Sequence, residues 1–322
     1  MSDPLLAQLA ERLAPQHISD LRPLKGGASS LTYAGWRAES RVVVKVAPPG
    51  VPPTGHRDVL RQARILSALS ATTVPVPEIL VEDVGEPPDV PPLFVMSFLD
   101  GVSTEPLFDD ADAGPEAVVG ERLRDAAATL ARLHGLETGP LGPAAEPVAR
   151  PLDEVERWGR TLETVDPALA PGWQDVADAL RTTVPPGLPA AILHGDFRLG
   201  NLLADGGRIT GIIDWEIWSV GDPRVDAGWF LINCDPRTYR RASRYVKAVP
   251  PVDELAEIYR QEMKNGLPEL DWFCALACFK STATWSLIVK HNRRRSAPDP
   301  ELESMALALP GLLSRARDLL PV

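Results

Sequence analysis

Three oxygen-bearing side chains interrupt apolar, strand-like runs in the stretch HGDFRLGNLLADGGRITGIIDWE, which covers residues 194–216. They are Asp196, Asn201 and Asp214. Burying a carboxylate or an amide without a partner is costly, so the stretch predicts that each of the three has one. Oxygen ligands of this kind favour Mg²⁺, which keeps waters and phosphate oxygens as its other ligands.

The spacing of these residues is that of a phosphoryl-transfer site. In an H-x-D-x-x-x-x-N pattern the aspartate lies at the acceptor hydroxyl and the asparagine lies at a metal ion. We therefore expect Asp196 to orient the attacking hydroxyl and to accept its proton. Asn201 and Asp214 are the expected Mg²⁺ ligands. Phosphoryl transfer requires little covalent chemistry from the protein. The protein must also hold the phosphates in place.

Candidates for holding the phosphates occur in the first fifty residues. The stretch LKGGASSLTY contains Gly26 and Gly27, where a backbone turn can approach phosphate oxygens without Cβ interference, and Ser29 and Ser30, which add donors. Lys45 follows in RVVVKVA, a run of β-branched residues that predicts a strand. We expect this turn and Lys45 to bind the phosphates of ATP or GTP.

Periodicity predicts which elements position these residues. In the first part of the chain it predicts strands at 18–25, 31–36, 41–47, 79–82 and 93–98 and helices at 5–13 and 57–69. Beyond residue 101 it predicts helices at 121–136, 173–182, 224–232, 252–265, 269–290 and 300–319. The predicted fold class is α+β, with a nucleotide-binding domain at 1–97 and a catalytic and substrate-binding domain at 98–322.

Composition narrows the class of protein and its partners. The chain has 322 residues, of which 44% are hydrophobic and 24% charged, typical of a soluble protein with more than one compact part. A net charge of −11 argues against a nucleic-acid partner, which needs a basic face. The start, MSDPLLAQLAERL, is amphipathic, unlike a signal peptide, and no apolar run approaches the roughly 20 residues of a membrane span. We expect a cytoplasmic protein without membrane contact.

Together the motifs resemble the aminoglycoside phosphotransferase and choline-kinase-like family of small-molecule kinases. The resemblance rests on LKGGASSLTY, VVVKV, HGDFRLGNLL with IIDWE, and GDPRVDAGW, and it runs from about Leu21 to Leu312. The order of the motifs is closest to the acyl-CoA-dehydrogenase-associated phosphotransferases of that family. The resemblance implies a bilobal protein-kinase-like fold. It also implies Mg²⁺-dependent transfer of the γ-phosphoryl group of ATP to an aminoglycoside-like, amino-alcohol or sugar-like hydroxyl.

The resemblance implies further residue roles. Lys45 resembles the lysine that contacts the α- and β-phosphates. The backbone groups of Ser97 and Leu99, in the segment that joins the lobes, would meet the adenine edge. His194 and Asp226 resemble residues that support the catalytic loop without taking part in the chemistry.

The chain departs from the family pattern at two positions. Gln62, in LRQARILSAL, stands where the family usually has a glutamate that pairs with the lysine. A glutamate about 4 Å from an ammonium contributes on the order of 4 kcal/mol of gross Coulomb energy at intermediate dielectric, and an amide oxygen supplies much less. We hypothesise that Lys45 is therefore less firmly positioned before nucleotide binds. Ser30 stands where the family often has asparagine, so the bonding of the phosphate loop differs in detail.

Other functions stay open on the sequence. A nucleotide-binding pseudokinase or regulatory scaffold would account for Gln62, and a protein kinase would use the same motifs. The segment between Asp214 and the next predicted helix is short, which leaves little room for the peptide platform of a protein kinase. A zinc site at His194 and Asp196 lacks a further His or Cys close in sequence.

The acceptor is constrained only by charge and by aromatic residues. Residues 98–322 hold 34 Asp and Glu against 24 Lys and Arg, which favours a neutral or cationic acceptor, although acidity also serves solubility. Trp215, Trp218 and Trp229 are expected core residues, with an aromatic wall beside a cationic acceptor as the alternative.

Overall fold

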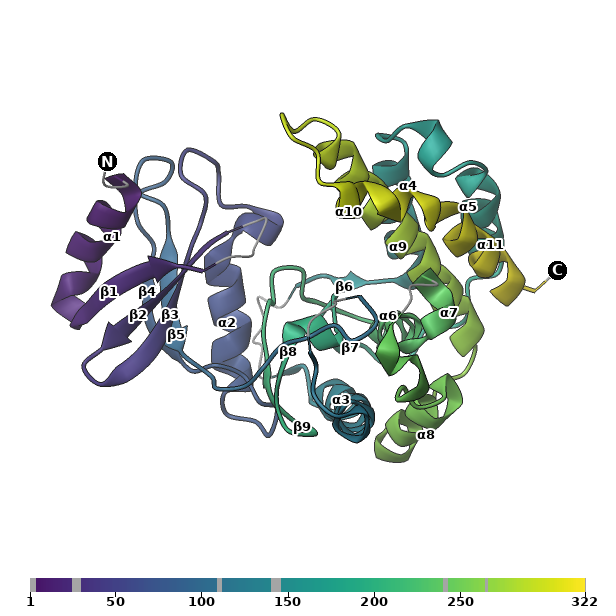
Figure 1. The fold of residues 1–322 in the computed structure, drawn as a ribbon, viewed down its shortest axis with the longest axis horizontal. Coiled ribbons are helices and arrows are strands. Elements are labelled where there is room, and N and C mark those ends of the chain that lie inside the picture. The colour runs from purple at the N-terminus through teal and green to yellow at the C-terminus, as the bar shows by residue number, and fades with distance from the viewer. Residues whose placement is uncertain are drawn as a thin grey trace. The chain divides into compact units, whose positions relative to one another are not determined.

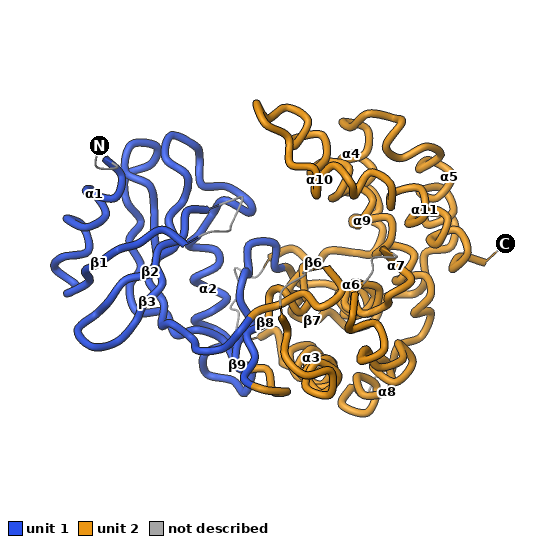
Figure 2. The backbone as a smooth tube through the Cα atoms, viewed as in Figure 1, with its two compact units in different colours: residues 1–102, 203–205, 210–218 blue, residues 103–202, 206–209, 219–322 orange. Residues whose placement is uncertain are grey.

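The structure is a computed structural model, and it describes residues 4–24, 30–108, 112–139, 146–239, 243–263 and 266–321. The chain forms two compact units, drawn in different colours in Figure 2. Unit 1 contains residues 1–102, 203–205 and 210–218, and unit 2 contains residues 103–202, 206–209 and 219–322. The segment that follows the predicted catalytic loop thus contributes residues to both units.

Unit 1 is built on a five-stranded antiparallel sheet with strand order β1-β2-β3-β5-β4 (Figure 1). Alternation along β3 decides which side chains face which helix, because successive side chains of a strand point to opposite faces. Val42, Val44 and Val46 lie in a core that also contains Leu9 and Leu13 of α1. The residues between them, including Lys45, therefore point to the opposite face of the sheet. The bounds are α1 Pro4–Leu13, β1 Ile18–Pro23, β2 Leu31–Arg37, β3 Ser40–Val46, α2 Val59–Leu69, β4 Ile79–Asp83 and β5 Leu93–Ser97.

Unit 2 is mostly helical and is organised around the long helix α9, which packs against α4, α6 and α11 (Figure 1). Short strands β6, β10 and β7 form a three-stranded sheet in that order, and β8 pairs with β9. The helices are α3 Glu116–His134, α4 Pro151–Leu162, α5 Trp173–Thr182, α6 Arg224–Cys234, α7 Pro236–Tyr239, α8 Val252–Glu262, α9 Leu270–Asn292, α10 Pro300–Ser304 and α11 Leu309–Leu319. The strands of unit 2 are β6 Val148–Ala149, β7 Ala191–Leu193 and β10 Ser219–Gly221. Most residues of β8 Leu202–Asp205 and β9 Arg208–Ile212 belong to unit 1.

Helix α9 confirms the helix predicted over 269–290, and most of its residues are buried. Within the described part of the chain it is the one helix whose length and composition would allow it to cross a membrane. Of its most apolar stretch, 78% is buried inside the protein, as in the core helix of a globular unit.

The other predicted strands and helices are found, most of them close to their predicted bounds, although α3 begins five residues earlier than predicted, at Glu116. Helix α4 was not predicted, because the proline-rich run before it indicates a connection. Pro151 instead occupies the first turn, where its missing N–H costs nothing, and the Asp153 carboxylate accepts from the Arg150 amide at 2.8 Å. The predicted helix over 300–319 is broken at 305–307, and the next helix begins at Leu309 with Pro310 in its first turn.

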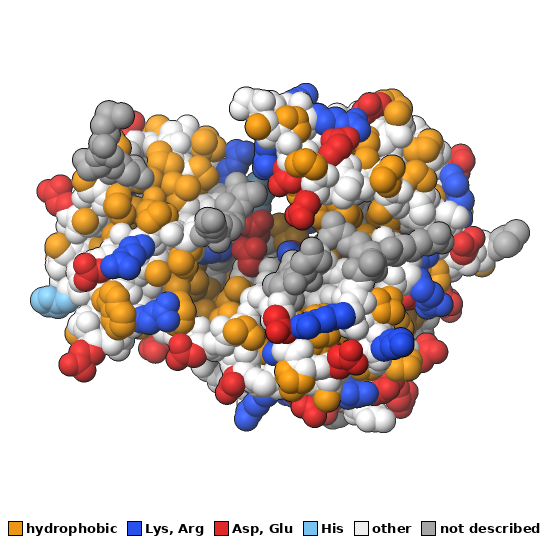
Figure 3. All heavy atoms as spheres, in the orientation of Figure 1, with side chains coloured by type: hydrophobic (Ala, Val, Ile, Leu, Met, Phe, Trp, Pro, Cys, Tyr) orange, Lys and Arg blue, Asp and Glu red, His pale blue; other side chains and the backbone are white. Residues whose placement is uncertain are grey.

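Surface charges of both signs are interspersed on the face that Figure 3 shows. Exposed ion pairs occur in unit 2, for example Arg124 with Glu254 at 2.6 Å and Arg293 with Glu303 at 2.7 Å. Pairs of this kind add little to stability.

Gly228 allows α6 to approach α9 closely, and its replacement provides a test of the packing in unit 2. A Cβ at this position would lie 2.5 Å from the carbonyl oxygen of Phe273. We expect Gly228→Ala to lower the free energy of unfolding by about 1–3 kcal/mol, measured by urea denaturation. Gly311→Ala in α11, where an added Cβ meets nothing within 4 Å, is the matched control and should be neutral or stabilising. Equal stabilities of the two variants would contradict this account.

Candidate active site

Lys45 is held in unit 1 by two oxygen atoms from distant parts of the sequence. Its Nζ lies 3.2 Å from Gln62 Oε1 on α2 and 3.1 Å from Asp214 Oδ1 after β9. The three side chains border one small cavity of about 10 Å³ together with Phe94 and Trp215. Gln62 thus contacts Lys45, and Asp214 supplies the negative charge that Gln62 lacks.

Asp214 combines an unusual backbone conformation with partial exposure. Its φ is 66°, in the left-handed region that non-glycine residues seldom adopt and that Asp tolerates better than most. About a third of its side chain is exposed, 34% against 9% for Lys45. A strained residue at a functional position is a common feature of binding sites. Asp214 therefore presents a carboxylate that is tied on one side and accessible to ligands.

The predicted phosphate turn is described only at its end. Gly26, Gly27 and Ser29 lie outside the described residues. Ser30 is buried, and its hydroxyl has no hydrogen-bond partner within the described part of the chain.

The two residues whose backbone groups are predicted to meet the adenine edge differ in whether their amide N–H is already hydrogen-bonded. The amide N–H of Ser97 donates to the carbonyl oxygen of Glu78 at 2.8 Å, and Ser97 Oγ accepts from the Glu78 amide at 2.9 Å. This N–H is therefore already used at the end of β5. No hydrogen bond of the Leu99 amide is seen among the described residues. Of these two residues, Leu99 is the one whose backbone N–H could still donate to an adenine base.

Asp196 lies in unit 2 and receives a donor on each carboxylate oxygen. Oδ1 accepts from the indole Nε1 of Trp229 at 2.9 Å. Oδ2 accepts from Asn201 Nδ2 at 2.8 Å and from Arg198 Nε at 3.3 Å. The carboxylate is therefore fixed in direction while about a quarter of its surface stays exposed, 26%.

Asn201 is oriented by the same contacts. Its Nδ2 also donates to the backbone oxygen of Asp196 at 2.9 Å, so both contacts use the amide nitrogen. The amide oxygen is left as the atom that can face a cation. Oxygen donors of this kind, few in number, suit Mg²⁺. No cluster of three or more His, Cys, Asp or Glu side chains arranged to hold a metal is found among the described residues.

His194 and Asp226 lie directly behind the Asp196 loop. Asp226, on α6, accepts from the amides of His194 at 2.6 Å and of Gly195 at 2.9 Å. His194 Nδ1 accepts from the Asp196 amide at 3.1 Å. Burial acts to raise the pKa of Asp226, but His134, His194 and Lys280 outweigh it, so the pKa lies below its usual value. The carboxylate that fixes the loop thus stays charged.

Arg198 and Glu105 tie the outer side of the same loop, and neither was predicted. Arg198 Nη1 lies 3.1 Å from Glu105 Oε2, and this oxygen also accepts from the Gly200 amide at 2.9 Å. Burial disfavours the charged form of Arg198, but Asp196 and Glu105 raise its pKa above the usual value. Arg198 could have been suspected from its place between Asp196 and Asn201. Nothing in the sequence around Glu105 indicates its role.

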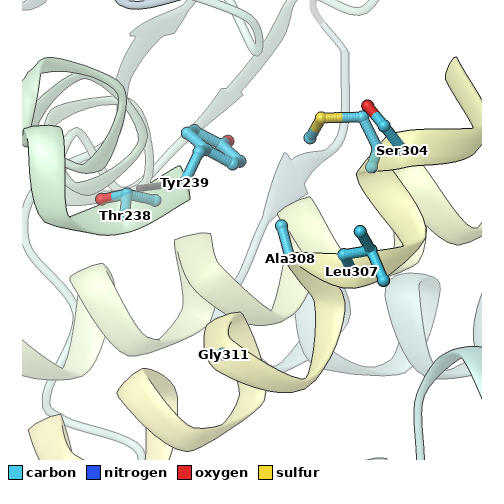
Figure 4. A pocket seen from close by; sticks show the side chains of 7 residues that line it. Thr238, Tyr239, Ser304, Leu307, Ala308 and Gly311 are labelled. Atoms are coloured by element: carbon cyan, nitrogen blue, oxygen red, sulfur yellow. The ribbon is translucent and has the colours of Figure 1, made fainter. Parts of the chain in front are cut away.

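A larger cavity of about 340 Å³ lies elsewhere in unit 2, between α7 and the segment from α10 to α11 (Figure 4). All its lining residues are uncharged, and the hydroxyl of Tyr239 contacts Ser281 Oγ at 2.8 Å. The cavity therefore offers no charged group to phosphate or metal. Its lining consists of Thr238, Tyr239, Ser304, Met305, Leu307, Ala308 and Gly311.

The contact between Lys45 and Gln62 gives the hypothesis about Lys45 a direct test. We expect Gln62→Glu to tighten binding of AMP-PNP with Mg²⁺ by about three- to tenfold, roughly 0.7–1.4 kcal/mol. A second carboxylate would position the ammonium before nucleotide arrives, and desolvation cancels most of the gross Coulomb gain. Calorimetric titration measures the affinity. Gln62→Met, which keeps the volume but removes the oxygen, should weaken binding, whereas an unaltered affinity and turnover in Gln62→Glu would refute the hypothesis.

Comparison with known proteins identifies the family of the chain. Residues 20–263 match the phosphotransferase enzyme family, and the chain belongs to that family. The mouse protein acyl-CoA dehydrogenase family member 10 is 25% identical over 287 residues, which cover 83% of this chain and 26% of the mouse protein. The chain thus spans about a quarter of the length of this relative.

Solved structures establish the fold. A Ralstonia eutropha protein described as an aminoglycoside phosphotransferase superposes with a TM-score of 0.76 at 18% identity, over 98% of this chain and 97% of that one. A thermostable mutant of aminoglycoside phosphotransferase APH(4)-Ia, in a ternary complex with AMP-PNP and hygromycin B, gives 0.63 at 16% identity, over 96% and 98%. The predicted family and the predicted α+β kinase-like fold are both confirmed.

Proposed function

We propose that this protein is a Mg²⁺-dependent small-molecule kinase that transfers the γ-phosphoryl group of ATP, or of GTP, to a hydroxyl. The observation that carries the proposal is the arrangement of Asp196 and Asn201. One carboxylate is fixed by an amide nitrogen at 2.8 Å, and the oxygen of that amide is thereby left for a cation. Membership of the phosphotransferase family supports the same reaction class.

In the proposed reaction the acceptor oxygen attacks the γ-phosphorus. The bond from that phosphorus to the β–γ bridging oxygen breaks, and ADP leaves. Asp196 accepts a hydrogen bond from the acceptor hydroxyl and takes its proton as the new P–O bond forms. Trp229 and Asn201 keep the carboxylate in one direction, so that the hydroxyl is oriented before the reaction.

The phosphates and the metal have their own residues in the proposal. Lys45 binds the α- and β-phosphates, and its ammonium contacts Gln62 and Asp214. Asn201 and Asp214 are the proposed Mg²⁺ ligands. When bound, Mg²⁺ supplies neutralisation of the phosphate charge.

Two rival functions are less well supported. The pseudokinase hypothesis depends on Gln62, yet Lys45 keeps a carboxylate partner in Asp214. The protein-kinase hypothesis needs a long segment after Asp214, whereas β10 begins at Ser219 and α6 at Arg224. Neither observation favours the rival over the small-molecule kinase.

A screen for acceptor-dependent ADP release tests the proposed function. The protein is incubated with MgATP and, separately, with aminoglycosides, macrolides, choline-like amines, sugars, nucleosides or a peptide library. We expect ADP release with at least one small-molecule acceptor, none with peptides, and slow Mg²⁺-dependent hydrolysis without acceptor. Nucleotide binding without either reaction would establish the pseudokinase instead.

A further inference from the structure

Lys280 is a buried charge that the proposed reaction does not use. It is the only charged residue between positions 272 and 289 of the core helix α9, and it is 5% exposed. A lysine is seldom buried to this extent unless its charge is compensated, because removal of an ammonium from water costs several kcal/mol. The groups that surround Lys280 should therefore show how its charge is compensated and what role it has.

The ammonium of Lys280 lies against the Asp196 loop. Its Nζ donates to the carbonyl oxygen of Gly195, the residue before Asp196. It also lies 4.2 Å from the ring centroid of Trp229 and 5.6 Å from that of Trp158. Trp229 is the residue whose indole N–H donates to Asp196 Oδ1. Lys280 thus contacts both the backbone and the side chain that set the direction of the carboxylate.

No carboxylate lies within ion-pair distance of Lys280 Nζ among the described residues. The charged groups that act on Lys280 electrostatically lie farther away. They are Asp196 on the loop, Glu154 and Arg157 on α4, and Asp226 on α6. Burial lowers the pKa of Lys280, and the three carboxylates oppose this effect. Asp226 is already engaged by two backbone amides and Glu154 by the indole of Trp158 at 2.9 Å.

We propose that Lys280 is a positioning residue for Asp196, which holds the loop through Gly195, fixes the ring of Trp229, and keeps a positive charge behind the carboxylate. The proposal rests on the proposed function, in which Asp196 takes the proton of the acceptor hydroxyl. Packing alone would not require a lysine, because an apolar side chain of similar volume fills a core position at no cost in desolvation. The proposed role of the Lys280 charge is therefore to position Asp196.

The kinetic test is Lys280→Met. We expect turnover to fall about 10- to 100-fold, the range seen when a partner of a reacting group is removed, with the KM for ATP within about twofold of the unmodified value. The melting temperature should be unchanged or higher. Lys280→Arg should recover part of the turnover.

Lys290→Met is the matched control, since Lys290 lies at the end of the same helix and donates to Thr164 O. It should retain the kinetics of the unmodified protein. A Lys280→Met variant with unchanged turnover would overturn the proposal. So would a lowered melting temperature with no recovery of turnover in Lys280→Arg, which would indicate a packing role alone.

A second measurement is independent of activity. The chain has six lysines, so the side-chain NMR signals of lysine can be followed one by one, and Lys280→Met assigns the signal of interest. We expect Lys280 to lose its proton at lower pH in Asp196→Asn than in the unmodified protein, because a neighbouring negative charge is removed. Asp205→Asn, at an exposed position, should not change the titration. An identical titration in all three proteins would overturn the proposal. A changed titration of Lys280 in Asp196→Asn, together with no ADP release from any acceptor, would contradict the proposed kinase function. It would still support the link between Lys280 and Asp196.

Discussion

Replacement of Asp196 by asparagine should lower the turnover of phosphoryl transfer by about 10²–10⁴-fold while nucleotide still binds. The variant keeps the shape of the side chain but cannot accept the proton of the acceptor hydroxyl. Nucleotide affinity should change little, because the residues proposed to hold the phosphates lie elsewhere in the chain. Acceptor-dependent ADP release measures the turnover, and calorimetric titration with AMP-PNP measures the affinity.

The contacts of Asp196 determine which controls this experiment needs. Both carboxylate oxygens receive N–H donors, from Trp229 on one side and from Asn201 and Arg198 on the other. An asparagine must point its own NH₂ group at one of these donors, so some local rearrangement is expected. The melting temperature should therefore be measured as well. Asp205→Asn is the same substitution at an exposed position and should retain full turnover. Turnover retained in Asp196→Asn would remove Asp196 from the proposed reaction.

The parts of the site that sequence predicts well are those that depend on local pattern. The β-branched run of β3 places Lys45 on a strand, and the alternation of the strand places it on the face opposite Val44. The pairing of Gln62 with Lys45 follows from the resemblance to the family, and Gln62 meets Lys45 on the buried face of α2. Asp196 and Asn201 are five residues apart, so a single tight loop is enough to bring them together. These placements need only a motif or the period of one strand.

The parts that could not be predicted are contacts between segments far apart in the chain. Glu105 reaches Arg198 across 93 residues, and Lys280 reaches Gly195 across 85. Such pairs depend on how the helices pack against one another, and this packing has no signature in the local sequence. For Lys280 a weak indication existed, since a lone charge in an apolar helix requires compensation. Likewise, the prediction for Ser97 could not anticipate that its amide is used by Glu78, because a bulge in the pairing of β4 with β5 decides this.

Replacement of Asp214 by asparagine should lower turnover by about 10²–10³-fold and raise the Mg²⁺ concentration needed for half-maximal activity. A metal ligand contributes several kcal/mol to the transition state, and each 1.4 kcal/mol or so corresponds to tenfold in rate. Asparagine is the informative substitution, because it tolerates the left-handed conformation of this residue better than alanine does. The change then removes the charge without forcing the backbone to move.

Asp214 also holds Lys45, at 3.1 Å, so the loss of a metal ligand must be separated from the loss of this ion pair. Nucleotide affinity measured with Mg²⁺ and with EDTA makes the separation. If Asp214 acts through the metal, the variant should bind more weakly only when Mg²⁺ is present, whereas an equal loss in EDTA would mean that Asp214 acts through Lys45. Asp20→Asn is the matched control, since Asp20 is exposed and has a φ of 54°. It shares the backbone conformation of Asp214 and lies outside the proposed site, so a loss of turnover there would trace the effect to backbone strain instead.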